Sequence, residues 1–115
     1  MEERASREKF KAQDYTYKVF WSEADGAWIG TASEFKSLSF IDENDQLDAF
    51  AGIVGLVGEA FDEMCGDGEE PPVPFSKQEY SGRFALRMTP EQHRRLAEEA
   101  AEMGASMNHL VVSRI

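Results

Sequence analysis

The sequence contains a single cysteine, Cys65, and only two histidines among its 115 residues. One cysteine excludes an internal disulfide framework, and with so few histidines the chain lacks the ligands of a structural zinc site. The sequence also contains no Ser-His-Asp or Cys-His arrangement typical of nucleophilic catalysis, and no phosphate-binding glycine loop. We therefore expect a protein that is not an enzyme, with no catalytic residue, no metal site and no cofactor.

Long hydrophobic runs are also missing. The longest strongly apolar stretch, from Ala49 to Phe61, is interrupted by three glycines and by Glu59, and it is too short to span a membrane. Residues 1–11 are charged throughout, which argues against a signal peptide. We expect a cytoplasmic protein without a membrane partner.

Positive charge is scarce and unevenly distributed. The chain has 12 Lys+Arg against 22 Asp+Glu, a formal net charge of −10, so it cannot bind polyanions nonspecifically over its whole surface. Residues 1–81 carry 7 basic and 18 acidic side chains, whereas residues 82–115 carry 5 and 4. Any contact with nucleic acid must therefore be local, and the acidic first part either meets a basic partner or is simply a solvated surface.

The first part of the chain has the pattern of a small antiparallel sheet. Residues 15–21 are aromatic and β-branched and predict a strand. Asp25-Gly26 is a favoured tight-turn pair, after which residues 27–31 supply the returning strand of a hairpin. A third strand is predicted over residues 36–41.

A long helix is predicted from about Asp45 to Cys65, followed by a glycine and proline connector over residues 66–74 that leads to a short edge strand at 73–76. The helix is apolar on two sides, so one side suits the sheet and the other indicates burial against another chain. Gly52, Gly55 and Gly58 each lower helix propensity by roughly 1 kcal/mol, which indicates either close packing or tolerance in a buried helix. One apolar stripe comprises Leu47, Phe50, Val54, Val57, Phe61 and Met64, and the other comprises Ala49, Ile53, Leu56 and Ala60.

Carboxylates near the start of this helix leave an enzymatic alternative open. A metal-dependent nuclease would use such a cluster, but helix capping and solvation explain the same residues without a metal. Divalent-metal-dependent nuclease activity of the purified protein would separate the two interpretations. The residues are Asp42, Glu43, Asp45 and Asp48.

The last part of the chain predicts one strand and two helices. Residues 83–88 alternate, with three apolar side chains on one face and Arg83, Ala85 and Arg87 on the other. Thr89 is placed as a helix N-cap, with proline at the next position and Gln92 completing a capping box. The helix buries Leu96, Ala97, Ala100 and Met103 and ends at Gly104, and Ser106 caps a second helix whose shared face holds Met107, Leu110, Val111 and Ile115.

A single strand in this part cannot satisfy its own backbone hydrogen bonds. Pairing with the same strand of a second chain gives an antiparallel ribbon, a homodimer, and the option of a dimer of dimers. The outer face of the ribbon fits the DNA major groove, where Arg83 and Arg87 suit the acceptors of guanine. The start of the second helix, at Ser106, Met107 and Asn108, can aim backbone N–H groups at a phosphate.

This pattern resembles the ribbon-helix-helix family of DNA-binding repressors over residues 82–115. The resemblance rests on Gly82 to Pro90, then His93 to Leu96, then Gly104 to Asn108. It implies that Arg83, Ala85 and Arg87 occupy the base-reading positions. Alanine at the middle position departs from the polar residue often found there and leaves two strong readers per chain.

The first part resembles the HicB antitoxin family over residues 15–76, through the hairpin, the third strand, the long helix and the proline-rich exit. Together the two resemblances imply an α+β chain: a charged, flexible segment at 1–14, a HicB-like domain with a three- to four-stranded antiparallel sheet on one long helix at 15–76, a linker at 77–81, and a ribbon-helix-helix dimerisation domain at 82–115.

The implied function is neutralisation of a basic, mRNA-cleaving HicA-type toxin by the first domain, with repression of the shared operon through operator DNA bound by the second. The alternative is a stand-alone ribbon-helix-helix transcriptional regulator without a toxin, whose first domain serves oligomerisation or ligand sensing. A small basic reading frame beside the gene would distinguish them.

Overall fold

The computed structural model describes residues 10–115 of the chain. The chain divides into two compact units, Met1–Glu79 and Tyr80–Ile115. Most of the segment expected to be flexible, residues 1–9, lies outside the described residues. No helix in the described part is long and apolar enough to cross a membrane.

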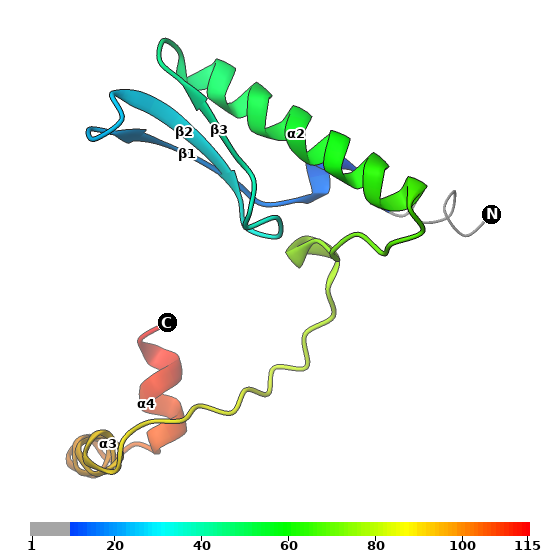
Figure 1. Ribbon diagram of the computed structural model, residues 1–115. Coiled ribbons are helices and arrows are strands. Elements are labelled where there is room, and N and C mark those ends of the chain that lie inside the picture. Colours follow the sequence, from blue (N-terminus) through cyan, green and yellow to red (C-terminus); the bar gives the residue numbers. More distant parts are fainter. Residues whose placement is uncertain (1–9) are drawn as a thin grey trace. The chain divides into compact units, whose positions relative to one another are not determined.

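The first unit contains a three-stranded antiparallel sheet in the order β1-β2-β3 (Figure 1). The strands are β1 (Tyr17–Ser22), β2 (Ala27–Ala32) and β3 (Ser39–Asp42). The predicted hairpin is confirmed, and its turn places Gly26 at a φ of +59°, a conformation that favours glycine. The third strand starts later than predicted, because residues 35–38 form a turn closed by the Leu38 N–H donating to the carbonyl of Phe35 at 3.0 Å.

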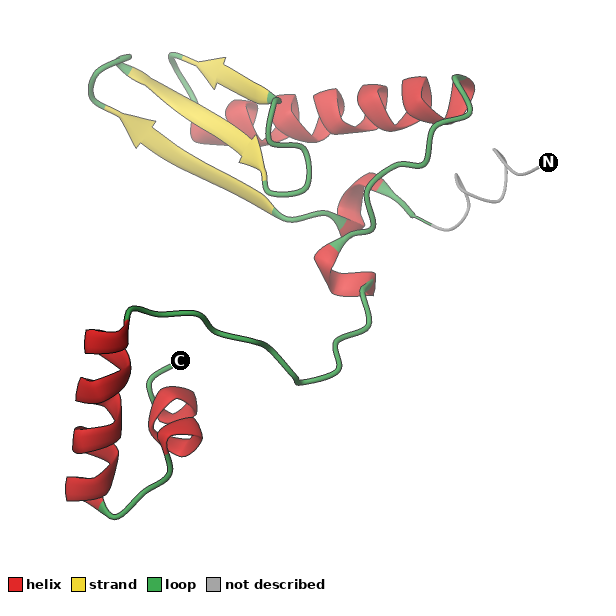
Figure 2. Ribbon diagram, turned by 60° about the horizontal axis from the view of Figure 1, so that its bottom comes forward, coloured by secondary structure: helices red, strands yellow, loops and turns green. Residues whose placement is uncertain are grey.

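One long helix, α2 (Gln46–Gly66), covers one face of this sheet (Figure 2). The Asp45 carboxylate caps it by accepting a hydrogen bond from the Leu47 N–H at 2.8 Å. The predicted α+β architecture, with a long helix on a three-stranded antiparallel sheet, is thus confirmed.

The buried row of α2 combines the two predicted stripes. Its members repeat every fourth residue, so the row crosses the helix surface obliquely and takes residues from each stripe. Leu47, from the first predicted stripe, is 75% exposed instead. The buried residues are Ala49, Ile53, Val57, Phe61 and Cys65.

Two glycines allow α2 to lie close to the sheet. A Cβ at Gly30 of β2 would lie 2.7 Å from the Ala49 carbonyl oxygen, and a Cβ at Gly52 would overlap the ring of Phe40. Close packing therefore explains Gly52. It does not explain Gly55 or Gly58, where nothing lies within 4 Å of the added Cβ among the described residues.

The prediction that residues 1–14 are flexible is wrong for residues 10–14. Phe10 is 5% exposed in the same apolar cluster as Tyr15, and a short 3-10 helix, η1 (Ala12–Asp14), connects them. The Asp14 carboxylate accepts a hydrogen bond from the Lys11 N–H at 2.9 Å, which fixes the start of η1. Burial of the Phe10 ring outweighs the charged composition that indicated a mobile segment.

The edge strand predicted at residues 73–76 is also absent, because the segment forms the 3-10 helix η2 (Phe75–Lys77). The Tyr15 hydroxyl donates to the Pro72 carbonyl at 2.8 Å, and the Ser76 hydroxyl donates to the Asp14 carbonyl at 2.8 Å. Pro74 is fully buried. This exit segment, residues 72–77, is thus held on the first unit by side-chain hydrogen bonds and not by strand pairing.

Glu34 makes a third contact that holds residues 72–77 on the first unit. Its carboxylate accepts hydrogen bonds from the Thr16 N–H at 3.0 Å, from the Thr16 hydroxyl at 3.1 Å and from the Phe75 N–H at 3.1 Å. Partial burial raises the pKa of Glu34, but these hydrogen bonds outweigh it, so that the pKa lies below its ordinary value of 4.5.

We expect Glu34→Gln to destabilise the first unit by about 1 to 2 kcal/mol at pH 7, because a neutral amide is a weaker acceptor for three donors. The folded-state pKa is lowered, so the carboxylate's contribution is fully present above pH 4.5 and is lost as the pH falls through the folded-state value. Urea unfolding of both proteins at pH 7 and at pH 3 measures this. Glu23→Gln, in the exposed β1–β2 turn, is the control. The prediction is contradicted if the free energies of unfolding of wild type and Glu34→Gln differ by as much at pH 3 as at pH 7.

The second unit contains α3 (Pro90–Met103) and α4 (Met107–Ser113). The capping box is confirmed, since the Gln92 N–H donates to the Thr89 hydroxyl at 3.1 Å and the Thr89 N–H donates to the Gln92 side chain at 3.0 Å. Gly104 ends α3 at a φ of +69°, as predicted from its position.

The core of the second unit is small. Ala100 and Leu110 are its buried residues, and α3 and α4 pack together around them. Of the other positions expected to be buried in α3, Leu96 is half-buried, whereas Ala97 and Met103 are exposed. One chain alone therefore leaves most of the apolar surface of this unit uncovered.

Candidate nucleic-acid and dimerisation surface

The candidate site is built on residues 82–88, which precede α3. Gly82 has a φ of +81°, and the Arg83 N–H donates to the Ser81 hydroxyl at 3.1 Å, so the chain turns sharply before this segment. Within the described residues, the segment pairs with no strand. The predicted strand at 83–88 is thus not formed by one chain, and its formation with a second chain stays a prediction.

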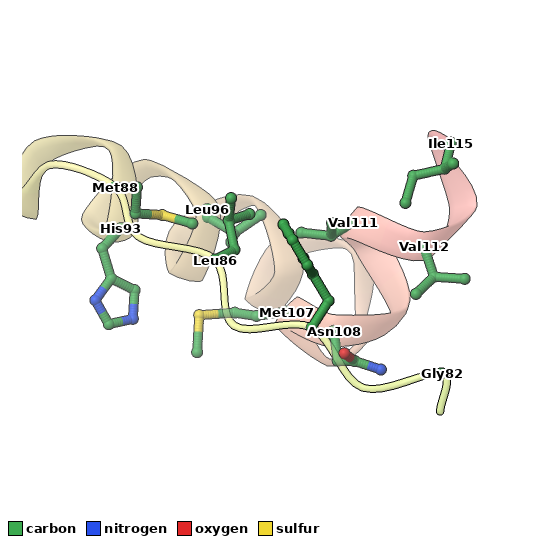
Figure 3. Close-up of a pocket in the computed structure, with 11 residues that line it drawn as sticks. Gly82, Leu86, Met88, His93, Leu96, Met107, Asn108, Val111, Val112 and Ile115 are labelled. Atoms are coloured by element: carbon green, nitrogen blue, oxygen red, sulfur yellow. The ribbon is translucent and has the colours of Figure 1, made fainter. Parts of the chain in front are cut away.

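The apolar residues of this segment line an open groove with α3 and α4 (Figure 3). Phe84 is 87% exposed and Leu86 is 54% exposed, although both are large and apolar. The groove has a volume of about 660 Å³. Its lining residues are Gly82, Phe84, Leu86, Met88, His93, Leu96, Met107, Asn108, Val111, Val112 and Ile115.

Two lining residues were not predicted. Val112 lines the groove, whereas Leu110, predicted to share a face with Met107, is 1% exposed in the core of the unit. His93, which entered the sequence-based prediction only as part of the ribbon-helix-helix pattern, lies at the end of the groove beside Met88 (Figure 3). The helical spacing of α4 could have identified Val112, since residues 108, 111, 112 and 115 share a face.

The positive charges of the second unit fall into two groups. Arg94 pairs with Glu91 and Glu98, which raises the pKa of Arg94 above its usual value, and Arg114 pairs with Glu99. Arg95 is 3.8 Å from Glu91. The remaining two arginines of this unit have no such partner among residues 10–115.

Arg83 and Arg87 form no ion pair within the described residues, and both are exposed, as is Ala85 between them. None of the three lines the groove, whereas Phe84 and Leu86 do. The extended segment therefore carries apolar side chains toward the groove and unpaired guanidinium groups elsewhere. Such groups are free to bind a phosphate or a guanine edge.

Ser106, Met107 and Asn108, which were all predicted to contact a phosphate, have different surroundings at the start of α4. The Ser106 hydroxyl is used inside the chain, where it accepts a hydrogen bond from the His109 N–H at 3.0 Å. The side chains of Met107 and Asn108 line the groove. Their backbone N–H groups have no acceptor within the described residues, so any phosphate contact here would come from the main chain.

Two of the four carboxylates considered for a metal site, Asp42 and Asp45, have local structural roles. Asp42 accepts hydrogen bonds from the Asn44 N–H at 2.9 Å and from the Asp45 N–H at 2.8 Å, and Asp45 caps α2. Over residues 10–115, no group of three or more His, Cys, Asp or Glu side chains is arranged to hold a metal ion. Cys65 is buried in the core.

Comparison with known proteins gives one match. The sequence model of the HicB family matches residues 66–115, from the end of α2 to the end of the chain. The match covers the second unit and its approach, whereas the resemblance of the first part concerned residues 15–76. No curated protein and no solved structure matches the chain.

Proposed function

Because its second unit matches the HicB family, we propose that this chain is the antitoxin of a HicA/HicB-type toxin–antitoxin system in the cytoplasm. It neutralises a basic, mRNA-cleaving toxin and represses its own operon by binding operator DNA. It acts by binding and occlusion, without catalysis, metal or cofactor.

The single observation that supports the DNA-binding half is the arrangement of residues 83–88. Apolar side chains from this segment line a groove that one chain leaves open, and two unpaired arginines alternate with them. A second copy of the chain would pair strand with strand, complete a ribbon-helix-helix fold and cover the groove. The ribbon would then present Arg83 and Arg87 of each chain to the major groove.

The charge of the first unit supports the toxin-binding half. Residues 1–79 carry 18 acidic against 7 basic side chains, so this unit attracts a basic protein and repels nucleic acid. Each unit then has its own ligand, with the toxin on the first and the operator on the second. A homodimer formed through the second unit, or a dimer of such dimers, would carry two or four toxin sites.

A stand-alone transcriptional regulator is the second candidate function. It is favoured by the range of residues that the family model matches. The match begins at residue 66 and includes none of the sheet of the first unit. In that case the first unit would bind a second copy or a small ligand. Co-purification from the native host with a small basic protein encoded beside the gene would support the antitoxin instead.

We expect a chain truncated after Glu79 to neutralise the toxin, because that compact unit holds the acidic surface. Co-expression with the toxin in a growth assay measures neutralisation, and a binding titration with purified toxin gives the affinity. Residues 80–115 alone are the control and should not rescue growth. A tenfold loss of affinity on truncation is accounted for by lost avidity, but a folded fragment with no detectable binding would contradict toxin binding by this unit.

A further inference from the structure

We propose that the outer face of α2 is the surface that docks the cationic partner protein. This inference rests on the proposed function, since it assigns the toxin contact to one part of the first unit. The outer face of α2 is defined here as Leu47, Ala51, Val54, Gly55 and Gly58, with Asp48, Glu59 and Asp62 beside them.

The outer face of α2 is apolar where a solvated helix should be polar. Leu47 is 75% exposed, although the sheet covers the opposite side of the same helix. At the margin of this face the Phe50 ring packs edge-on against Tyr17 of β1, at a centroid distance of 5.8 Å, and still remains 46% exposed. Ala51 and Gly55 follow Leu47 at intervals of four and are also exposed. A strip of this kind in the free unit marks an interaction surface.

The unexplained glycines of α2 lie on this strip. Gly52 is needed for the ring of Phe40, but a Cβ at Gly55 or Gly58 would meet nothing within 4 Å in the described structure. Alanine at either position would favour the helix and fit the free unit. Two glycines with no internal role leave the helix backbone open to close approach by a partner.

The charge beside the strip identifies that partner. Residues 37–76 contain ten Asp and Glu and no Lys, Arg or His. Asp48, Glu59 and Asp62 lie next to the strip by helical spacing, are exposed, and form no ion pair within the described residues. Two copies of this face would repel each other, whereas a basic protein with an apolar centre would be attracted.

The opposite face of the sheet serves as an internal comparison. Phe20, Ile29 and Ile41 form a cross-strand row there, in register on β1, β2 and β3. Ile41 is 57% exposed, so this face is also apolar. Lys18 lies on it over the Phe20 ring, with its ammonium nitrogen 5.3 Å from the ring centroid. The sheet face therefore carries a positive charge, whereas α2 contains no Lys, Arg or His.

The test uses the full chain and, as probe, the purified basic toxin encoded beside the gene. Calorimetric titration at low and at physiological salt should show Glu59→Lys/Asp62→Lys binding at least tenfold more weakly than wild type, with a smaller salt dependence. Gly55→Gln should keep or raise the melting temperature, since it fills open space, and still weaken binding at least tenfold. Weaker binding by a variant that is at least as stable as wild type cannot be attributed to misfolding.

Two controls match these variants. Glu23→Lys/Asp25→Lys makes the same change in net charge in the β1–β2 turn, and Ile41→Ser alters the apolar row of the sheet face. Both should bind within threefold of wild type. If the α2 variants bind the toxin with wild-type affinity, the inference is overturned and the proposed function remains intact. The same conclusion holds if those variants change their sedimentation but not their affinity for the toxin. Failure of the wild-type chain to bind the toxin would overturn both.

Discussion

Leu86→Asp is expected to convert the protein to a monomer and to unfold residues 80–115. Leu86 is 54% exposed in one chain and lines the groove with Met107 and Val111. In the proposed dimer it lies in a core shared by two chains, where an unpaired carboxylate costs several kcal/mol and is introduced twice. Sedimentation velocity at micromolar concentration measures the loss of the dimer, and circular dichroism measures the loss of helix.

Ala85→Asp is the matched control, because it places the same charge one residue away on the other face of the segment. Ala85 is exposed and does not line the groove. This variant should remain a dimer with wild-type helix content, while its affinity for DNA falls. A wild-type chain that sediments as a folded monomer at micromolar concentration would refute dimerisation through this segment.

Local sequence signals predicted the elements whose causes are local. The Asp25-Gly26 turn, the Thr89–Gln92 capping box and Gly104 at the end of α3 each depend on a few adjacent residues, and the structure has all three. The limits of α2 followed similarly from Asp45 and the glycine at its end. In each case the residue that determines the turn or the helix end lies within four residues of it.

Elements that depend on distant residues were not predicted. The exit segment forms η2 and not a strand because Glu34 binds the Phe75 N–H and Tyr15 binds the Pro72 carbonyl, across 41 and 57 residues. Phe10 is ordered by a core assembled from β2 and α2. Spacing along the chain carries no information about these contacts.

The alternation of side chains in the candidate site was predictable from the sequence. What covers the groove was not. Strict alternation over residues 83–88 separated the groove side from the arginine side, and the structure places Phe84, Leu86 and Met88 at the groove. What closes the groove is not encoded locally. Within the described residues this segment forms no strand pair, so the proposed ribbon requires a second chain.

Arg83→Ala/Arg87→Ala should abolish operator binding while preserving the dimer. Neither side chain lines the groove or forms an ion pair within the described residues, so folding loses nothing that the structure shows. The double substitution removes four guanidinium groups from the two-chain ribbon. Each bidentate contact to a base contributes roughly 1 to 3 kcal/mol of discrimination, so affinity for the operator should fall more than a hundredfold.

Arg94→Ala/Arg95→Ala is the control with the same change in charge, because those arginines pair with glutamates along α3. Gel-shift titration at physiological salt should leave that variant within about tenfold of wild type. Backbone N–H groups of Met107 and Asn108 would still reach phosphates in both variants. On a chain with a net charge of −10, such contacts are too weak to hold DNA alone. If Arg83→Ala/Arg87→Ala keeps the wild-type affinity for the operator, the ribbon is therefore not the element that reads the DNA sequence.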